Sequence, residues 1–130
     1  MIGTLLGLLA ARAAVAEVIN LDGRCQYPAS AARYRHETTL ILCDQLAIET
    51  GEASATLDFG QRSWGSMLRV SGRMSGRRMA VERVTLRSGE SITAGGTCEV
   101  FYSGARISVV SCLAKAGAKS WAANFVPSRL

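Results

Sequence analysis

The stretch CEVFYSGARISVVSC, residues 98–112, has the pattern of a β-hairpin closed by its own cysteines. Alternating apolar and polar residues run on both sides of a short segment that contains glycine, which is typical of a hairpin. A three-residue loop, Gly104-Ala105-Arg106, places Cys98 opposite Cys112. Opposed residues in an antiparallel pair are close enough for a disulfide. A two-residue turn breaks this register, so the expected bridge depends on the loop length.

The other two cysteines are Cys25 and Cys43, which flank a longer excursion of the chain. An even number of cysteines in an exported protein predicts two disulfides, and four cysteines allow three pairings. The hairpin favours Cys98–Cys112, which leaves Cys25–Cys43, although the sequence alone does not choose between the pairings. The rival interpretation is a four-cysteine metal site. The chain contains no Cys-x-x-Cys pair, so we expect no metal site and no cofactor.

Export itself is inferred from the first 16 residues. Residues 2–11 are apolar, and the small residues after them end in Ala14-Val15-Ala16, which predicts signal-peptide cleavage between Ala16 and Glu17. No lysine or arginine precedes the apolar run, which leaves open whether Met1 is the true start. A buried N-terminal helix is the alternative.

The apolar run is shorter than the roughly 20 residues that a membrane-spanning helix needs. We therefore expect a signal peptide over residues 1–16 and a single exported domain over residues 17–130. No membrane span is expected in the mature chain. The expected localisation is periplasmic or secreted.

Short alternating runs continue through the rest of the chain and predict an all-β fold. Asp44 interrupts one run and predicts a strand break, and a change of phase at Glu82-Arg83 predicts a bulge. Pro28–Arg35 is the one helical candidate after the signal segment. The expected strands cover residues 37–49, 53–59, 66–74, 77–87, 99–103, 107–114 and 120–126.

The alternation also predicts which side chains point inward. Seven or eight short strands with two disulfides predict a small antiparallel β-sandwich or a partly closed β-barrel. The expected inward residues are Leu40, Leu42, Leu46, Ile48, Ala53, Ala55, Leu57, Phe59, Leu68, Val70, Met74, Met79, Val81, Val84, Leu86, Trp121, Ala123 and Phe125.

Positive charge is concentrated between residues 62 and 87. This segment holds seven arginines and a single acid, Glu82, which gives a net charge of +6 against −2 for the rest of the expected mature chain. Arginine suits planar, bidentate contact with carboxylate or phosphate groups. The alternative is an ordinary solvated strand face in a chain that uses arginine in place of lysine, because 13 of its 15 basic residues are arginine.

A two-residue turn at Ser75-Gly76 makes residues 66–87 a hairpin. Its apolar residues then point to one side, and Arg69, Arg73 and Arg78 point to the other. In this register Arg73 faces Arg78, and Arg69 faces Glu82. We therefore expect these three arginines to form an exposed patch that binds an anionic group.

Trp64 precedes this hairpin and follows Arg62-Ser63. An aromatic ring beside an arginine suits stacking on a sugar or another ring. The same ring could equally close one end of the fold, and the sequence does not decide between the two roles.

Enzymatic interpretations find little support. The single histidine, His36, stands between charged residues without a nucleophile motif, and the neighbouring acids Glu49 and Glu52 flank Gly51 in an expected turn. Paired acids in a glycosidase must converge in space. The close methionines are Met67, Met74 and Met79. They are interpreted as core residues rather than copper ligands, because they fall on apolar strand faces or beside them.

The tetrapeptide Ser103-Gly104-Ala105-Arg106, with Lys115 downstream, resembles the inhibitory loop of small periplasmic lysozyme inhibitors. Size, export signal and all-β pattern also suit that family. The aromatic-Lys-Gly pattern that follows this loop in the family is missing here. The resemblance implies inhibition of a hydrolase by insertion of the loop, and no residue roles are carried over from it.

Three functions are therefore weighed. The first is a small non-enzymatic periplasmic or secreted domain that binds an anionic, glycan-like or envelope-protein partner through Arg69, Arg73, Arg78 and Trp64. The second is an exported inhibitor of a hydrolase that acts through residues 103–106. The third is a hydrolase with an unrecognised site. Specific nucleic-acid binding is not expected, and the sequence does not give the oligomeric state.

Overall fold

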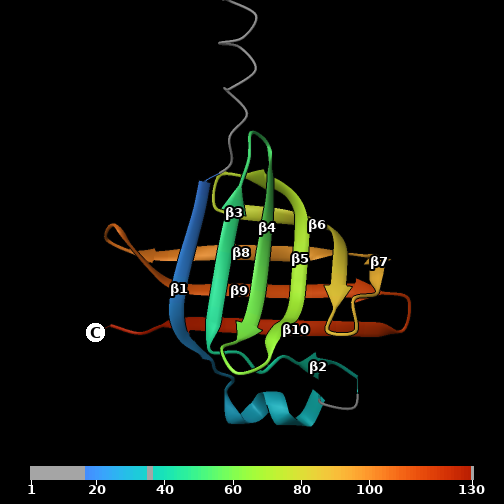
Figure 1. Ribbon diagram of the computed structural model, residues 1–130. Coiled ribbons are helices and arrows are strands. Elements are labelled where there is room, and N and C mark those ends of the chain that lie inside the picture. Colours follow the sequence, from blue (N-terminus) through green and yellow to red (C-terminus); the bar gives the residue numbers. More distant parts are fainter. Residues whose placement is uncertain (1–16, 35–36, 130) are drawn as a thin grey trace, which may run out of the picture.

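The computed structural model describes residues 17–34 and 37–129, which form β-strands and one short 3-10 helix that lies outside the strands (Figure 1). The all-β expectation is confirmed. The expected signal peptide with Ala16 lies outside the described residues, as does His36. Strand β1 begins at Glu17, the first residue of the expected mature chain. No helix in the described part is long and apolar enough to cross a membrane.

Ten strands follow one another within residues 17–34 and 37–129. The region 17–25 and the short run 91–93 are strands that the sequence analysis did not expect. The elements are β1 (Glu17–Cys25), η2 (Ala29–Tyr34), β2 (Thr39–Leu40), β3 (Gln45–Thr50), β4 (Ser54–Gln61), β5 (Gly65–Ser75), β6 (Arg78–Leu86), β7 (Ser91–Thr93), β8 (Gly95–Ser103), β9 (Arg106–Ala116) and β10 (Lys119–Pro127).

Eight of these strands form a closed antiparallel barrel. Their order is β1-β3-β4-β5-β6-β8-β9-β10, and β10 returns to pair with β1 over Gly23–Cys25. Of the two expected architectures the barrel is therefore present, and it is closed rather than partly open. Two further short strands pair with strands of the barrel: β2 runs parallel to β10, and β7 runs antiparallel to β6. Figure 1 shows β1, β3, β4 and β5 crossing over β8, β9 and β10.

Side chains fill the interior of the barrel. Phe59 and Phe125 are fully buried, and valines and leucines from the other strands close around them. Trp121 and Ala123 on β10 point inward as expected, and so does Met79 on β6. A small eight-stranded barrel has an interior just wide enough for such side chains. The expected strand alternation is thus confirmed for most positions.

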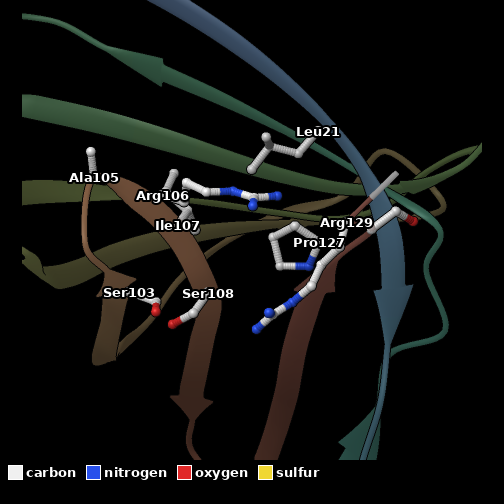
Figure 2. A pocket seen from close by; sticks show the side chains of 9 residues that line it. Leu21, Ser103, Ala105, Arg106, Ile107, Ser108, Pro127 and Arg129 are labelled. Carbon is white, nitrogen blue, oxygen red and sulfur yellow. The ribbon is translucent and has the colours of Figure 1, made fainter.

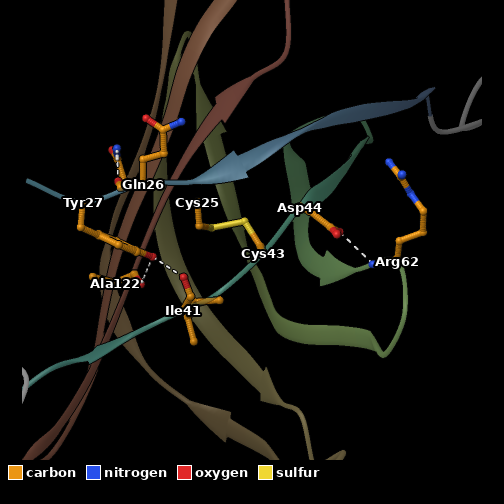
Figure 3. Close-up of a disulfide and its surroundings, with 9 residues drawn as sticks. Cys25, Gln26, Tyr27, Ile41, Cys43, Asp44, Arg62 and Ala122 are labelled. Carbon is orange, nitrogen blue, oxygen red and sulfur yellow. Dashed lines mark hydrogen bonds between the residues drawn. A yellow bond between two sulfur atoms is a disulfide. The ribbon is translucent and has the colours of Figure 1, made fainter.

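The stretch 37–49 departs from its expected pattern. Leu42 is 63% exposed, whereas Ile41 and Cys43 are buried, and Ala53 is exposed because β4 starts only at Ser54. The strand break expected at Asp44 is present. The break also changes which side chains before it point inward, because the chain that leads to Asp44 turns Cys43 inward to form the disulfide with Cys25 (Figure 3).

Three hairpins share one kind of turn. Gly76, Gly104 and Gly117 each stand first in a two-residue turn with φ between 62° and 64°. Glycine at the first central position is the signature of the type II′ turn, whose twist suits a hairpin. The prediction of a turn at Ser75-Gly76 is therefore wrong, because Ser75 pairs with Arg78 and the turn residues are Gly76 and Arg77. A type I′ turn at Ser75-Gly76 would require a positive φ at Ser75, which glycine adopts more easily than serine.

Both disulfides match the expected pairing, Cys25–Cys43 and Cys98–Cys112. The β8–β9 turn has two residues, Gly104 and Ala105, instead of the expected three. An extra residue in β9, Ser108, then shifts the register so that Cys98 lies opposite Cys112 after all. The bridge was correctly predicted, but a turn and a bulge together produce it.

The bulge expected at Glu82-Arg83 is present in β6. Ser71 pairs with Arg83 and Gly72 pairs with Val81, which leaves Glu82 as the unpaired extra residue. Gly72 approaches the partner strand so closely that a Cβ there would lie 2.0 Å from the carbonyl oxygen of Ala80. Glycine is thus required where β5 bends across the bulge.

Candidate functional site

The arginines singled out in the sequence lie on the outer surface of the barrel. The side chains of Arg69, Arg73 and Arg78 are 52%, 77% and 67% exposed. They share the outward face of β5 and β6, while Leu68, Val70 and Met79 point into the core. We call these three residues the arginine face.

Their partners across the hairpin differ from the expected ones. Because the turn lies one residue later, Arg73 does not face Arg78, and Arg69 does not face Glu82. The side chains keep their faces despite the shift, because the pairing near the turn moves by an even number of residues. The observed pairs are Arg73 with Ala80, Arg78 with Ser75 and Arg69 with Thr85.

Each arginine of this face lies beside a carboxylate. The Nη2 of Arg69 is 3.1 Å from Oδ2 of Asp58, and the Nη2 of Arg78 is 3.2 Å from Oε1 of Glu99. Both pairs are directly opposed across neighbouring strands. The third pair is diagonal, with Nε of Arg73 3.7 Å from Oε2 of Glu82. Opposite charges at such cross-strand positions stabilise a sheet modestly.

Sequence reasoning missed two of these three carboxylates. Asp58 on β4 and Glu99 on β8 both lie outside the arginine-rich segment, on the strands that flank the β5–β6 hairpin in the barrel. The alternation of β4 already placed Asp58 outward. Only the order of the strands, however, brings it beside Arg69, and a local pattern does not contain that order.

Two further arginines of the segment are held by polar side chains. Arg62 contacts Asp22 at 2.8 Å, and its backbone N–H donates to Oδ1 of Asp44 at 2.8 Å (Figure 3). Arg83 donates from Nη1 to the hydroxyl of Ser91 at 3.1 Å. Positive charge in this segment is therefore distributed over several separate contacts.

The last two arginines of the segment stack on aromatic rings. Arg87, which follows β6, lies 5.0 Å from the centre of the Trp64 ring, and Arg77, in the β5–β6 turn, lies 4.4 Å from that of Tyr102. These two pairs stand at opposite ends of the hairpin. Trp64 is 65% exposed, so it does not close the end of the barrel, and its arginine partner is Arg87 rather than the neighbouring Arg62.

The tetrapeptide 103–106 forms the exposed tip of the β8–β9 hairpin, which extends past β1 in Figure 1. Lys115, which accompanies it in the resemblance to lysozyme inhibitors, pairs with Gly95 at the other end of the same hairpin. Lys115 lies nine residues after Arg106 along β9, a distance of about 30 Å at the usual rise per residue. The structure therefore does not bring Lys115 to the loop.

The other residues considered for chemistry occupy structural positions. Met79 is buried in the core, and Met67 and Met74 pack against it at partly buried positions. Glu49 and Glu52 stand on either side of the β3–β4 turn, as expected. Within residues 17–34 and 37–129, no group of three or more histidine, cysteine or acidic side chains is arranged to hold a metal ion.

A partly buried, hydrogen-bonded side chain lies beside the Cys25–Cys43 disulfide. The hydroxyl of Tyr27 donates to the carbonyl oxygen of Ile41 at 2.6 Å and lies 3.0 Å from that of Ala122 (Figure 3). Burial raises the pKa of this hydroxyl above its usual value of 10.0. Tyr27 and the disulfide together fix the ends of the excursion between β1 and β3.

Comparison with known proteins identifies no relative: no family model, no curated protein and no solved structure matches this chain.

Proposed function

We propose that this chain is a periplasmic or secreted binding domain that engages an anionic, glycan-like partner through the arginine face. The observation that carries the proposal is the row of three exposed arginines with an arginine–aromatic pair at each end of its hairpin. Guanidinium groups suit carboxylate or sulfate groups, and exposed aromatic rings suit sugar rings. The packed interior directs a ligand to the outer surface.

The neighbouring carboxylates do not use up these arginines. A guanidinium has five N–H donors, and each contact in the arginine face joins one nitrogen to one carboxylate oxygen. Arg73 is the most exposed of the three, and its contact at 3.7 Å is longer than a hydrogen bond. It is therefore the residue best placed to contact a ligand.

The test measures heparin binding by calorimetry at several salt concentrations. We expect the variant Arg69→Ser/Arg73→Ser/Arg78→Ser to lose binding, while its free energy of unfolding falls by no more than about 1 kcal/mol, since surface ion pairs contribute little. Binding by the parent should weaken steeply as salt rises.

A matched variant removes three positive charges elsewhere: Arg24→Ser/Lys115→Ser/Lys119→Ser, all at exposed positions. It should keep most of the heparin affinity. Equal loss in both variants would mean that net charge alone attracts heparin. Unchanged binding in the arginine-face variant would reduce the face to a solvated strand surface.

Inhibition of a hydrolase is the second candidate, favoured by the exposed tip 103–106 that extends past the barrel. It predicts that the protein slows lysis of bacterial cell walls by lysozyme and that Arg106→Ala weakens the inhibition. Full lysozyme activity in the presence of excess protein would exclude lysozyme as the target.

Envelope-protein partners can be tested in parallel, by recovering bound proteins from envelope extract with the parent and with the arginine-face variant. A protein that only the parent retains would identify a partner of this face.

A further inference from the structure

A groove opens where β10 passes from β9 to β1. Strand β10 pairs with β9 as far as Phe125 and with β1 from Phe125 to Pro127, so β1 and β9 diverge beyond this crossing. The groove between them has a volume of about 350 Å³ (Figure 2). It is lined by Leu21, Ser103, Ala105, Arg106, Ile107, Ser108, Pro127, Ser128 and Arg129.

One wall of the groove belongs to a strand with an unpaired side. Residues 17–22 of β1 pair with β3, but in the described chain no strand pairs with their other side. The backbone N–H groups of Gly23 and Cys25 donate toward the chain at Cys43 and Asp44, whereas the carbonyl of Asp22 accepts from Ser128 on the opposite side. By strand alternation, the N–H and C=O groups of Val18 and Asn20 point to the unpaired side.

An unpaired strand side of this kind is a template for another strand. Val18 and Ile19 are exposed apolar residues on the same part of β1. Leu21, Ile107 and Pro127 add apolar surface within the groove. The backbone and these side chains together favour an extended peptide over a compact polar ligand.

The charge of the groove selects among peptides. Arg106 and Arg129 both extend their guanidinium groups into it (Figure 2). None of the nine lining residues is acidic, and neither arginine has a carboxylate oxygen within 4.0 Å among the described residues. A carboxylate on a bound peptide could therefore accept hydrogen bonds from these two guanidinium groups without displacing a side-chain carboxylate of the described residues.

We infer that this groove binds an extended peptide of apolar and acidic residues, which adds as a strand to residues 17–21 of β1 and places a carboxylate between Arg106 and Arg129. This site is separate from the arginine face and does not depend on the function proposed for that face.

The probe is a synthetic peptide of alternating valine and glutamate, titrated into the ¹⁵N-labelled protein. We expect the amide signals of Val18 and Asn20 to shift, together with those of residues 106–109. A peptide of alternating valine and lysine should cause no such shifts. Shifts confined to the arginine face, or equal shifts with the lysine peptide, would overturn the inference.

Backbone methylation tests strand addition directly. Alternate residues of a strand direct their N–H groups to opposite sides, so methylating either the valine or the glutamate nitrogens blocks one side only. Binding should be lost with at least one of the two methylated peptides. Unchanged binding of both would exclude backbone pairing and overturn the inference.

The side-chain test is Arg106→Ala/Arg129→Ala, with Lys115→Ala/Lys119→Ala as the variant of equal charge outside the groove. We expect the first variant to bind the valine–glutamate peptide about tenfold more weakly, the scale of one charge-assisted contact. The second variant should bind it with unchanged affinity. Equal affinities in both variants would contradict the role of the arginines. Shifts of the groove amides by a heparin oligosaccharide and not by the peptide would assign the groove to glycans instead.

Discussion

The arginine face and the groove beside β1 use the same residue type in opposite ways. On the arginine face, each arginine lies beside a carboxylate on a neighbouring strand. In the groove, Arg106 and Arg129 lie among serine, proline and aliphatic side chains. The arginines in the arginine-rich segment that form this face therefore have carboxylate neighbours, whereas the two arginines of the groove have none among the described residues. A high density of arginine along the sequence thus does not show which arginines lack an acidic partner in the fold.

The physical reason is that a sheet brings together strands from distant parts of the sequence. Asp58 and Glu99 reach the arginine face because β4 and β8 flank the β5–β6 hairpin. The groove lies where two strands separate, so it receives no such neighbours.

The strongest test disrupts the frame of the arginine face. In Gly72→Ala, the new Cβ meets the carbonyl oxygen of Ala80, and the bulge that positions Glu82 cannot form without backbone movement. We expect the free energy of unfolding to fall by on the order of 3 kcal/mol in urea denaturation. Gly95→Ala is the control, because no atom lies within 4 Å of a Cβ there. Equal stability of the two variants would contradict the close approach of β5 and β6.

Tyr27 provides a neutral reference for the ion pairs. Its hydroxyl is partly buried and hydrogen-bonded, unlike the exposed pairs of the arginine face. Tyr27→Phe should lower the free energy of unfolding by about 1–2 kcal/mol, more than Arg78→Ala, because it removes the hydroxyl donor from the backbone carbonyl of Ile41. Thermal unfolding of the two variants gives the comparison. A larger effect of Arg78→Ala would mean that the surface pairs are stronger than their exposure implies.

The same hydroxyl predicts a pH dependence. Burial raises the pKa of Tyr27 in the folded state, so the unfolded chain releases this proton first as pH rises. This contribution to stability is constant below about pH 10, the pKa in the unfolded chain, and is lost above it as pH approaches the folded pKa. Denaturation at alkaline pH should show this loss in the parent, and Tyr27→Phe should reduce it.

Removing the carboxylates should make the arginine face resemble the groove. The variant Asp58→Asn/Glu82→Gln/Glu99→Gln leaves the three arginines without acidic partners, so heparin affinity should rise by about tenfold. Glu49→Gln/Glu52→Gln/Glu90→Gln makes the same charge change at exposed positions elsewhere and should have a smaller effect. Calorimetry on both variants measures the difference. Equal gains would show that net charge, rather than local pairing, controls affinity.

The smallest expected effect concerns an arginine whose partner is a ring. A double-mutant cycle over Trp64→Ala and Arg87→Ala should give a coupling energy of about 0.5 kcal/mol in the free energy of unfolding, the scale of an exposed cation–π contact. The corresponding cycle for Arg69 and Asp58 should weaken more with salt, because both partners carry full charges. A coupling energy of zero between Trp64 and Arg87 would contradict this prediction and would mean that their contact does not stabilise the fold.

Several features followed from local patterns. The sequence placed Gly76 and Gly104 in turns, but Gly76 was expected second in its turn instead of first, and the turn that begins at Gly104 was expected to have three residues instead of two. The Gly-x signature of the type II′ turn would have placed the β5–β6 turn correctly. For β8–β9, the same signature alone would have argued against the Cys98–Cys112 bridge, because it says nothing about the extra residue in β9.

Local patterns in the sequence predicted the all-β class, the inward residues of most strands and the bulge at Glu82, and they favoured the two disulfide pairings that the structure contains. These depend on strand alternation and local turns, which a chain carries in its own order. Three features became visible only in the folded chain: the barrel closes through β1 and β10, Asp58 and Glu99 lie beside the arginine face, and a groove remains next to β1. These depend on which distant strands become neighbours, and alternation specifies the face of a side chain without specifying the strand that will lie beside it.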